Sequence, residues 1–191
     1  MENCRIVVSD VQHACYAEEV CVMIEDAAKL RGTGIAKRSP EYIRSKILQG
    51  KAVLALDGDK VTGFCYIETW EHGKYVANSG LIVHPDYRHQ KLALQIKKRI
   101  LRLSHELFPE AKVFGITTSN AVLKINFQLG YRPVTFSELT TDPEFWKGCQ
   151  GCVNYDILQR TGQKMCLCTG MIYDKVAVKL PTLSVDSEKE E

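Results

Sequence analysis

Residues 81–93 read Leu-Ile-Val-His-Pro-Asp-Tyr-Arg-His-Gln-Lys-Leu-Ala. The apolar start predicts a strand that ends near His84, and the apolar spacing over 93–108 predicts an amphipathic helix after a polar turn. At such a turn the first N–H groups of the helix lack intrahelical partners, and the helix dipole adds partial positive charge. Arg88 and Lys91 add formal positive charge there. The stretch therefore predicts a binding site for a pyrophosphate group.

The bulk composition is that of an ordinary globular protein, with 191 residues of which 45% are hydrophobic and 25% charged. A formal net charge of +2 gives no reason to expect a nucleic acid or a membrane surface as partner. No apolar run approaches the roughly 18 residues of a membrane span, and the first residues lack the order of a signal peptide. We therefore expect a cytoplasmic protein, with one domain over 1–175 and a polar, disordered tail over 176–191.

Apolar periodicity and turn residues predict an alternation of strands and helices. One helix is expected to begin at Pro40, after the N-cap Ser39, and to end before Gly50. The other expected helices cover 12–31, 93–108 and 121–129, and the expected strands cover 5–8, 52–56, 61–69, 75–83, 112–117, 131–136 and 165–173. The charged face of the 93–108 helix, which includes Lys97, is expected to be solvated.

The pattern V-H-P-x-Y-R-x-Q-x-L-A over 83–93 resembles the coenzyme A loop of the GNAT acyltransferases. Members usually read R-G-x-G-x-G/A; here His89 and Lys91 stand where glycines are common. The order of the predicted elements also matches that family over about residues 4–175. The resemblance implies an α/β GNAT fold, a mixed central sheet flanked by helices, and the binding of acetyl-CoA or another short acyl-CoA. The implied cofactor-binding residues are Leu81, Ile82, Val83, Arg88, His89, Gln90, Lys91, Leu92 and Ala93.

Three further segments resemble the acyltransferase domain of the N-acetylglutamate synthases. They are 34–43 (GIAKRSPEYI), 130–134 (GYRPV), and Asn154-Tyr155 with Arg160. This resemblance implies an amino-acid substrate, with Arg38 and Ser39 as the substrate-binding residues. An arginine fork suits a carboxylate, and a helix N-terminus favours an anion. In this reading Arg38 and Ser39 receive a substrate carboxylate; otherwise Ser39 only caps the helix and Arg38 only faces solvent.

The implied reaction is direct transfer of the acyl group to an amine, for which a fourth-strand N–H polarises the thioester carbonyl. The positions of the family's tyrosine and glutamate proton carriers hold Asn126 and Ala77 here. By residue type the candidates for proton transfer are Glu68, Tyr155, His72 and Tyr75. Asn120 either binds the pantetheine arm or a water, or is the N-cap of the helix that follows. We select Asn120, Tyr155 and Glu68 as the catalytic candidates.

Half of the eight cysteines lie close together near the end of the domain, as Cys149, Cys152, Cys166 and Cys168. The C-x2-C spacing is that of a zinc half-site, and on a strand Cys166 and Cys168 would share one face. A redox-sensitive pair and small buried thiols remain alternatives. No residue is assigned as a metal ligand from the sequence, and 145–175 is expected to form a cysteine-containing hairpin.

We therefore expect an N-acyltransferase that moves an acetyl or succinyl group to the α-amine of glutamate or a similar amino acid, in amino-acid biosynthesis. One alternative is a GNAT enzyme for another small amine or a protein N-terminus. Two others are a non-catalytic regulatory protein that binds coenzyme A and a zinc-stabilised interaction module. A homodimer is also expected from the resemblance.

Overall fold

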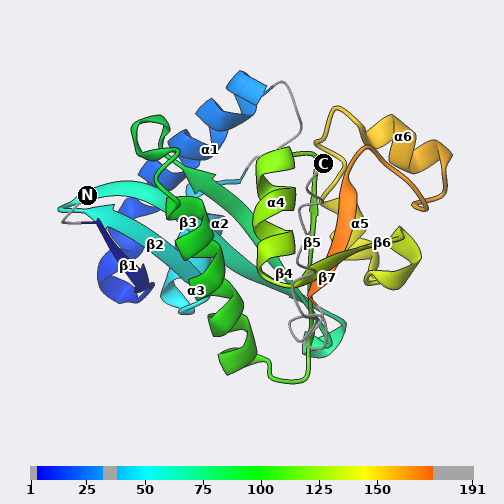
Figure 1. Ribbon diagram of the computed structural model, residues 1–191, viewed down its shortest axis with the longest axis horizontal. Helices are drawn as coiled ribbons and strands as arrows, with labels where there is room; N and C mark the ends of the chain where they lie inside the picture. Colours follow the sequence, from blue (N-terminus) through cyan, green and yellow to red (C-terminus); the bar gives the residue numbers. More distant parts are fainter. Residues whose placement is uncertain (1–3, 32–37, 174–191) are drawn as a thin grey trace, which may run out of the picture.

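The computed structural model describes residues 4–31 and 38–173 (Figure 1). Seven strands form one mixed sheet in the order β1-β2-β3-β4-β5-β7-β6. The strands are β1 (Cys4–Val8), β2 (Ala52–Asp57), β3 (Lys60–Trp70), β4 (Tyr75–Val83), β5 (Lys112–Thr117), β6 (Tyr131–Val134) and β7 (Thr169–Tyr173). The helices are α1 (Ala17–Arg31), α2 (Pro40–Leu48), α3 (Leu92–Leu107), α4 (Asn120–Gln128), α5 (Pro143–Lys147) and α6 (Tyr155–Arg160). None of the described helices is long and apolar enough to cross a membrane.

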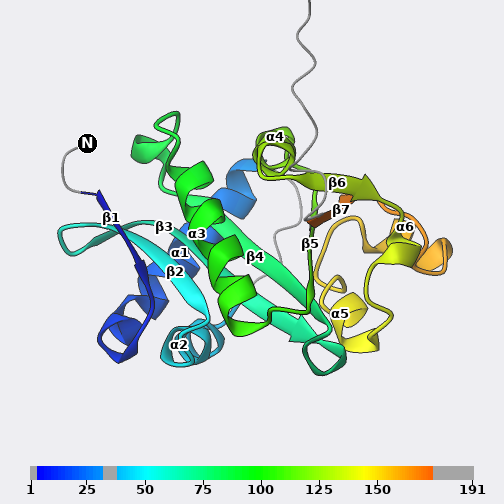
Figure 2. The ribbon, with the colours of Figure 1, turned by 60° about the horizontal axis from the view of Figure 1, so that its bottom comes forward.

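The helices form a layer on each face of the sheet (Figure 2). On one face α3 packs on β2, β3 and β4 through Ile96 and Ile100, which are fully buried. On the other face α1 and α2 pack on the same strands through Val20, Ile43 and Ile47. Because side chains alternate along a strand, β2 and β3 supply apolar residues to both layers and are buried throughout their centres.

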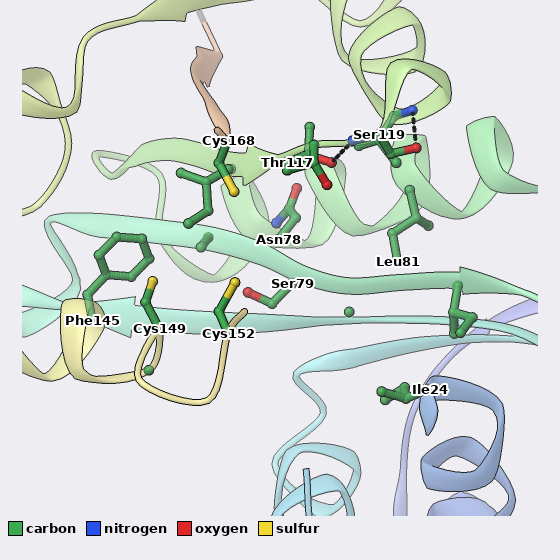
Figure 3. A pocket seen from close by; sticks show the side chains of 18 residues that line it. Ile24, Asn78, Ser79, Leu81, Thr117, Ser119, Phe145, Cys149, Cys152 and Cys168 are labelled. Atoms are coloured by element: carbon green, nitrogen blue, oxygen red, sulfur yellow. Dashed lines mark hydrogen bonds between the residues drawn. The ribbon is translucent and has the colours of Figure 1, made fainter. Parts of the chain in front are cut away.

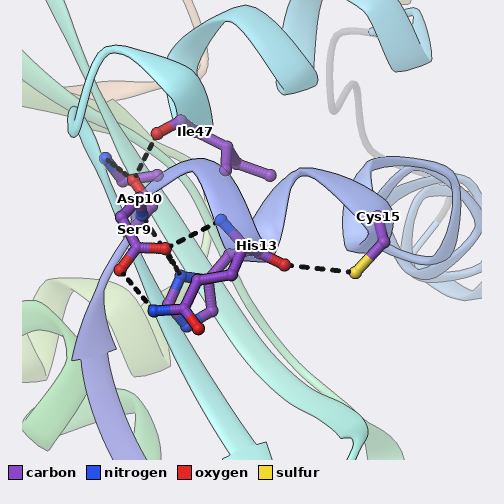
Figure 4. A network of polar contacts seen from close by, with 7 residues as sticks. Ser9, Asp10, His13, Cys15 and Ile47 are labelled. Carbon is purple, nitrogen blue, oxygen red and sulfur yellow. Dashed lines mark hydrogen bonds and ion pairs between the residues drawn. The ribbon is translucent and has the colours of Figure 1, made fainter.

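A short polar network fixes the chain where β1 leaves the sheet (Figure 4). The Ser9 hydroxyl donates to the Ile47 carbonyl at 3.0 Å and accepts from the Ala52 amide at 3.2 Å, which joins β1 to α2 and β2. Asp10 then accepts from the Gln12 amide at 3.0 Å and starts a 3-10 turn over Val11–Tyr16. The single helix expected over 12–31 is therefore divided, and α1 begins only at Ala17.

The last strand is shorter than predicted. Thr161 Oγ1 accepts from the Met165 amide at 3.3 Å and donates to the Met165 carbonyl at 2.8 Å, and this holds the chain in a turn before β7. Cys166 and Cys168 precede β7, so the prediction that they share a strand face is wrong. The prediction of a hairpin over 145–175 is also wrong. This segment contains the end of α5 and the whole of α6. β6 likewise ends at Val134, before a 3-10 turn over Phe136–Glu138.

Lys97 corrects the prediction that its helix face is solvated. Its side chain is only 2% exposed, and Nζ donates to Asn78 Oδ1 at 3.3 Å. The Tyr131 hydroxyl donates to the same oxygen at 3.0 Å, and Asn78 Nδ2 donates to Ser104 Oγ at 2.8 Å. Burial lowers the pKa of Lys97 to about 8 because the charged form loses its hydration. The network joins α3 and β6 to β4, but burial of the ammonium group lowers the stability of the folded state.

We expect Lys97→Met to raise the free energy of unfolding at pH 7 by about 1–3 kcal/mol, because a similar apolar volume replaces a buried charge. The folded pKa lies below the unfolded value of 10.5, so between about pH 8 and 10.5 the unfolded chain binds more protons. Wild-type stability should therefore rise with pH in this window, and the advantage of the variant should shrink. Urea unfolding at pH 7 and pH 10 measures both effects; a pH-independent difference would contradict this account.

Candidate functional site

The central cavity lies where β4 and β5 separate. The two strands pair over only three positions, Tyr75–Ala77 with Lys112–Phe114, although both continue beyond them. Past Ala77 they diverge, and a cavity of about 240 Å³ opens between them (Figure 3). Its lining includes 77–82 of β4, 115–119 after the paired part of β5, and Phe145 at the end of α5. On the sides that face each other, the backbones of β4 and β5 are therefore unpaired along this cavity.

A bulge in β4 faces this cavity. Tyr66 of β3 pairs with Ser79 but Phe64 pairs with Ile82, so Gly80 and Leu81 have no partner in the β3–β4 register. Gly80 has a φ of +64°, and a Cβ there would lie 2.5 Å from Cε1 of Tyr66. The bulge therefore requires glycine and leaves N–H groups of β4 outside the ladder, as expected at a bulge. This is the part of β4 against which the sequence places a thioester.

The loop from β4 to α3 has the backbone of a glycine-rich turn without the glycines. His89 and Lys91 have φ values of 62° and 61°, in the left-handed region. They are the two positions at which the GNAT pattern has glycines. Lys91 occupies the N-cap of α3 without a side-chain cap hydrogen bond, so the first N–H groups of this 16-residue helix remain available to a ligand. Arg88 is half-buried, and its Nε donates to the Val83 carbonyl at 3.3 Å.

Four polar side chains meet beside the cavity on the face that carries α2. Arg38 Nε donates to the Tyr66 hydroxyl at 2.8 Å, and Lys46 Nζ lies 2.8 Å from Glu68 Oε2. Glu68 pairs with Ala77 across the strands, and Tyr66 pairs with Ser79. Directly opposite residues share a face with Cβ atoms about 5 Å apart. The four groups therefore adjoin the cavity wall formed by β4.

Glu68 has the properties of a proton acceptor. Its side chain is 12% exposed, and Oε1 is buried without a hydrogen-bond partner among the described residues. Burial raises the pKa of Glu68 to about 7, although the Arg38 charge opposes the shift. Because Glu68 lies directly across from Ala77, it places a carboxyl group next to the position where the family pattern has its glutamate. A carboxyl group with this pKa exchanges a proton readily at neutral pH.

Neither Asn120 nor Tyr155, the other two catalytic candidates, is among the residues that line the larger cavity. Asn120 is exposed, and the N-cap of α4 is Ser119, whose hydroxyl accepts from the Val122 amide at 3.4 Å. The reading of Asn120 as the cap is therefore wrong. Tyr155 lines a separate small cavity behind the cysteines. Asn126 is buried, and its amide faces Met171.

Ser39 caps α2, as predicted, by accepting from the Tyr42 amide at 3.2 Å. Of the predicted cofactor residues, Leu81 and Ile82 line the cavity, and Val83 packs toward α3. Leu92 is buried at the start of α3, whereas Gln90 donates back to the Asp86 carbonyl at 3.3 Å. Ala93 is half-buried against the α3 face of the sheet.

Sequence reasoning missed Lys46 and Tyr66, which lie beside two predicted site residues. The alternation Phe64, Tyr66, Glu68 along β3 would have put Tyr66 on the Glu68 face. Nothing local in the sequence indicates that Lys46 of α2 reaches that face, since the contact depends on how α2 crosses the sheet. Ser79, Thr117 and Ser119 are further polar residues of the cavity wall (Figure 3).

Three cysteines also line the cavity, namely Cys149, Cys152 and Cys168. Burial raises the pKa of Cys149 to about 11 and that of Cys168 to about 12. Both thiols are therefore protonated at neutral pH and are poor nucleophiles. α5 sets the position of the turn with Cys149 and Cys152, because its Phe145 packs edge-on against Phe114 with ring centroids 5.2 Å apart.

No family model and no curated protein sequence matches this chain. Solved structures do match. N-acetylglutamate synthase from Neisseria gonorrhoeae, complexed with coenzyme A and N-acetyl-glutamate, is 14% identical with a TM-score of 0.64, over 89% of this chain and 34% of that one. Rv2747 from Mycobacterium tuberculosis, in complex with CoA and NLQ, is 12% identical with a TM-score of 0.62, over 88% and 98%. The putative acetyltransferase yncA from Salmonella typhimurium, solved with acetyl-CoA, is 14% identical with a TM-score of 0.59, over 90% and 94%.

These similarities establish the fold. The chain has the α/β fold of the GNAT acetyltransferases, with a mixed central sheet flanked by helices, and the expected fold is confirmed. The chain spans about a third of the length of the Neisseria gonorrhoeae synthase.

The left-handed loop gives a stability prediction. We expect His89→Gly to raise the free energy of unfolding by about 1 kcal/mol, because glycine adopts the observed φ without a Cβ penalty. The neighbouring Gln90→Gly should lower it by about 0.5–1 kcal/mol, since Gln90 is not left-handed, so that glycine adds unfolded-state entropy and also removes the side-chain bond to the Asp86 carbonyl. Chemical denaturation measures the free energy of unfolding of both variants. Equal changes in the two would show that the loop is not strained at His89.

Proposed function

We propose that this protein is an acyl-CoA-dependent N-acyltransferase whose acceptor is the α-amine of a carboxylate-bearing amino acid such as glutamate. The observation that carries the proposal is the position of Glu68 and Arg38. Glu68 pairs across the strands with Ala77, and Arg38 bonds to Tyr66, which pairs with Ser79; Ala77 and Ser79 line the cavity where β4 and β5 separate. A buried base and a guanidinium thus lie next to the strand whose free N–H groups face the cavity.

The donor half of the site suits acetyl-CoA or another short acyl-CoA. The uncapped start of α3 and the charges of Arg88 and Lys91 would hold the pyrophosphate. The unpaired backbone edges of β4 and β5 would flank the pantetheine arm, since an amide-bearing chain can hydrogen-bond to both. N–H groups near Gly80 and Leu81 would then polarise the thioester carbonyl. Three solved relatives of the same fold contain CoA or acetyl-CoA, which supports this half.

The part of the site proposed for the acceptor carries two cations and is largely buried. Arg38 offers a planar fork for a carboxylate, and the Tyr66 hydroxyl holds its Nε at 2.8 Å. Lys46 adds a second positive charge 2.8 Å from Glu68. Two cations beside one general base suit an acidic amino acid, because they bind its carboxylates while its amine reaches Glu68. N-acetyl-glutamate in the Neisseria gonorrhoeae structure supports this substrate class.

In the proposed reaction the Glu68 carboxylate takes a proton from the substrate ammonium, and the free amine attacks the thioester carbon. The negative charge that develops on the carbonyl oxygen is met by the β4 N–H groups. The new C–N bond forms and the C–S bond breaks, so that coenzyme A leaves as a thiolate. The second proton of the attacking nitrogen passes through water to this thiolate, which gives the neutral amide and the free thiol. Neither Cys149 nor Cys168 is needed, since the transfer is direct.

Thiol release from acetyl-CoA and succinyl-CoA tests the proposal, with glutamate, aspartate, ornithine, glutamine and short peptides as acceptors. We expect turnover with an acidic amino acid. Arg38→Gln should raise its KM about 10- to 100-fold, the loss of a charged hydrogen bond. Arg44→Gln is the matched control, because Arg44 lies on α2, the helix that Arg38 precedes, but pairs with the exposed Glu18.

Turnover with a peptide N-terminus alone would replace the amino-acid substrate by a protein one. Binding of coenzyme A in a thermal-shift assay without turnover would leave a regulatory protein that binds the cofactor. Equal KM values for wild type and Arg38→Gln would remove Arg38 from substrate binding.

Glu68 gives a pH prediction. Since burial raises its pKa to about 7, kcat/KM should rise with pH up to about 7 and then level off as the carboxylate forms. Glu68→Gln should lower kcat by about 100- to 10,000-fold and abolish this limb. Glu106→Gln, which removes a surface carboxylate paired with Arg99, should leave the profile unchanged. A profile for Glu68→Gln that keeps its acid limb would assign the base elsewhere.

A further inference from the structure

The cysteine cluster is the chemically richest feature that the proposed reaction does not use. Cys149 and Cys152 lie in the turn after α5, and Cys166 and Cys168 lie in the segment before β7. All four line one cavity of about 20 Å³ between that turn and α6. Figure 3 shows the Cys149 and Cys152 sulfurs directed toward the side on which Cys168 lies. Two segments distant in sequence therefore bring four sulfur donors to one small space.

The local backbone supports a metal-binding turn. The Cys152 amide donates to the Cys149 carbonyl at 2.9 Å, which closes the C-x2-C turn. The Asn154 amide then donates to Cys152 Sγ at 3.5 Å, and Cys166 Sγ contacts the Asn154 carbonyl at 3.8 Å. An N–H group directed at a cysteine sulfur stabilises negative charge on it and orients it, as outer-sphere groups do at metal sites.

The size and chemistry of the cavity favour one soft cation. A space of about 20 Å³ holds roughly one water molecule or one ion. Its remaining lining is mainly apolar, from Ile116, Phe136 and Leu158. Within the described ranges no three His, Cys, Asp or Glu side chains are placed, as they stand, so that they could hold a metal ion together. Metal binding therefore requires the cysteine side chains to rotate about their Cα–Cβ bonds, so that their sulfurs turn into the cavity that all four line.

We propose that Cys149, Cys152, Cys166 and Cys168 bind one Zn²⁺ ion as a four-thiolate structural site. Thiolates select zinc over the hard cations, and four of them satisfy its tetrahedral preference. The ion would fasten the turn after α5 to the segment before β7. Three of these cysteines also line the larger cavity, so the ion would fix the wall opposite β4. The zinc site does not depend on the proposed acyl transfer, so each proposal can fail without the other.

The test starts with the full-length protein purified without chelators under reducing conditions. Elemental analysis should find about one zinc per chain. After removal of zinc, titration with Co²⁺ alone should give thiolate-to-cobalt charge-transfer bands and the visible bands of a tetrahedral ion. Zinc should raise the melting temperature of the metal-free protein.

Cys152→Ser and Cys168→Ser should lose the stoichiometric zinc and the cobalt spectrum. Cys15→Ser is the matched control, because Cys15 is an exposed thiol far from the cluster in sequence, and it should bind as wild type does. Circular dichroism of the variants separates loss of metal from loss of fold. Metal-free wild type that gives no tetrahedral cobalt spectrum would overturn the proposal. A Cys149–Cys152 disulfide in the reduced preparation would overturn it as well.

Discussion

The short contact between β4 and β5 is the constraint on which the rest of the structure depends. Three residue pairs join the strands, and beyond Ala77 they separate. A sheet interrupted in this way exposes backbone N–H and C=O groups that must find other partners. β7 supplies part of the answer, because it pairs with β5 on the far edge and keeps that strand in the sheet. The opening itself is left for a ligand whose own amides can complete the edge.

The opening needs internal bracing, and the buried polar groups provide it. Asn78, at the point of divergence, is held by Ser104 of α3 and by Tyr131 of β6. An apolar residue at 78 could not join both elements, because packing has no fixed direction whereas hydrogen bonds do. Lys97 donates a further bond to Asn78 Oδ1, the oxygen that also accepts from Tyr131, at the cost of a buried charge. The buried charge therefore lowers the stability of the folded protein at the part of β4 that no longer pairs with β5.

The sequence predicted the order of elements well because periodicity and turn residues are local signals. It also marked residues 89 and 91 as glycine positions, and the backbone there is left-handed even though the side chains are not glycine. The sequence could not predict contacts that depend on how distant helices, strands and turns pack against one another. Lys97 looks like a surface residue from its charge, yet its helix face meets β4. Cys166 looks like part of a strand, yet Thr161 holds the preceding chain in a turn.

The same reasoning explains why Glu68 was only one candidate among several by sequence. The role that we propose for Glu68 depends on the β3–β4 register, which places it opposite Ala77, and on burial, which raises its pKa to about 7. Neither property can be read from residue 68 alone. A carboxyl group on β3 can take the place of one on β4 because directly paired positions share a face and lie about 5 Å apart. What must stay constant in such a site is the distance of the base from the bulge, and either of two adjacent strands can meet that requirement.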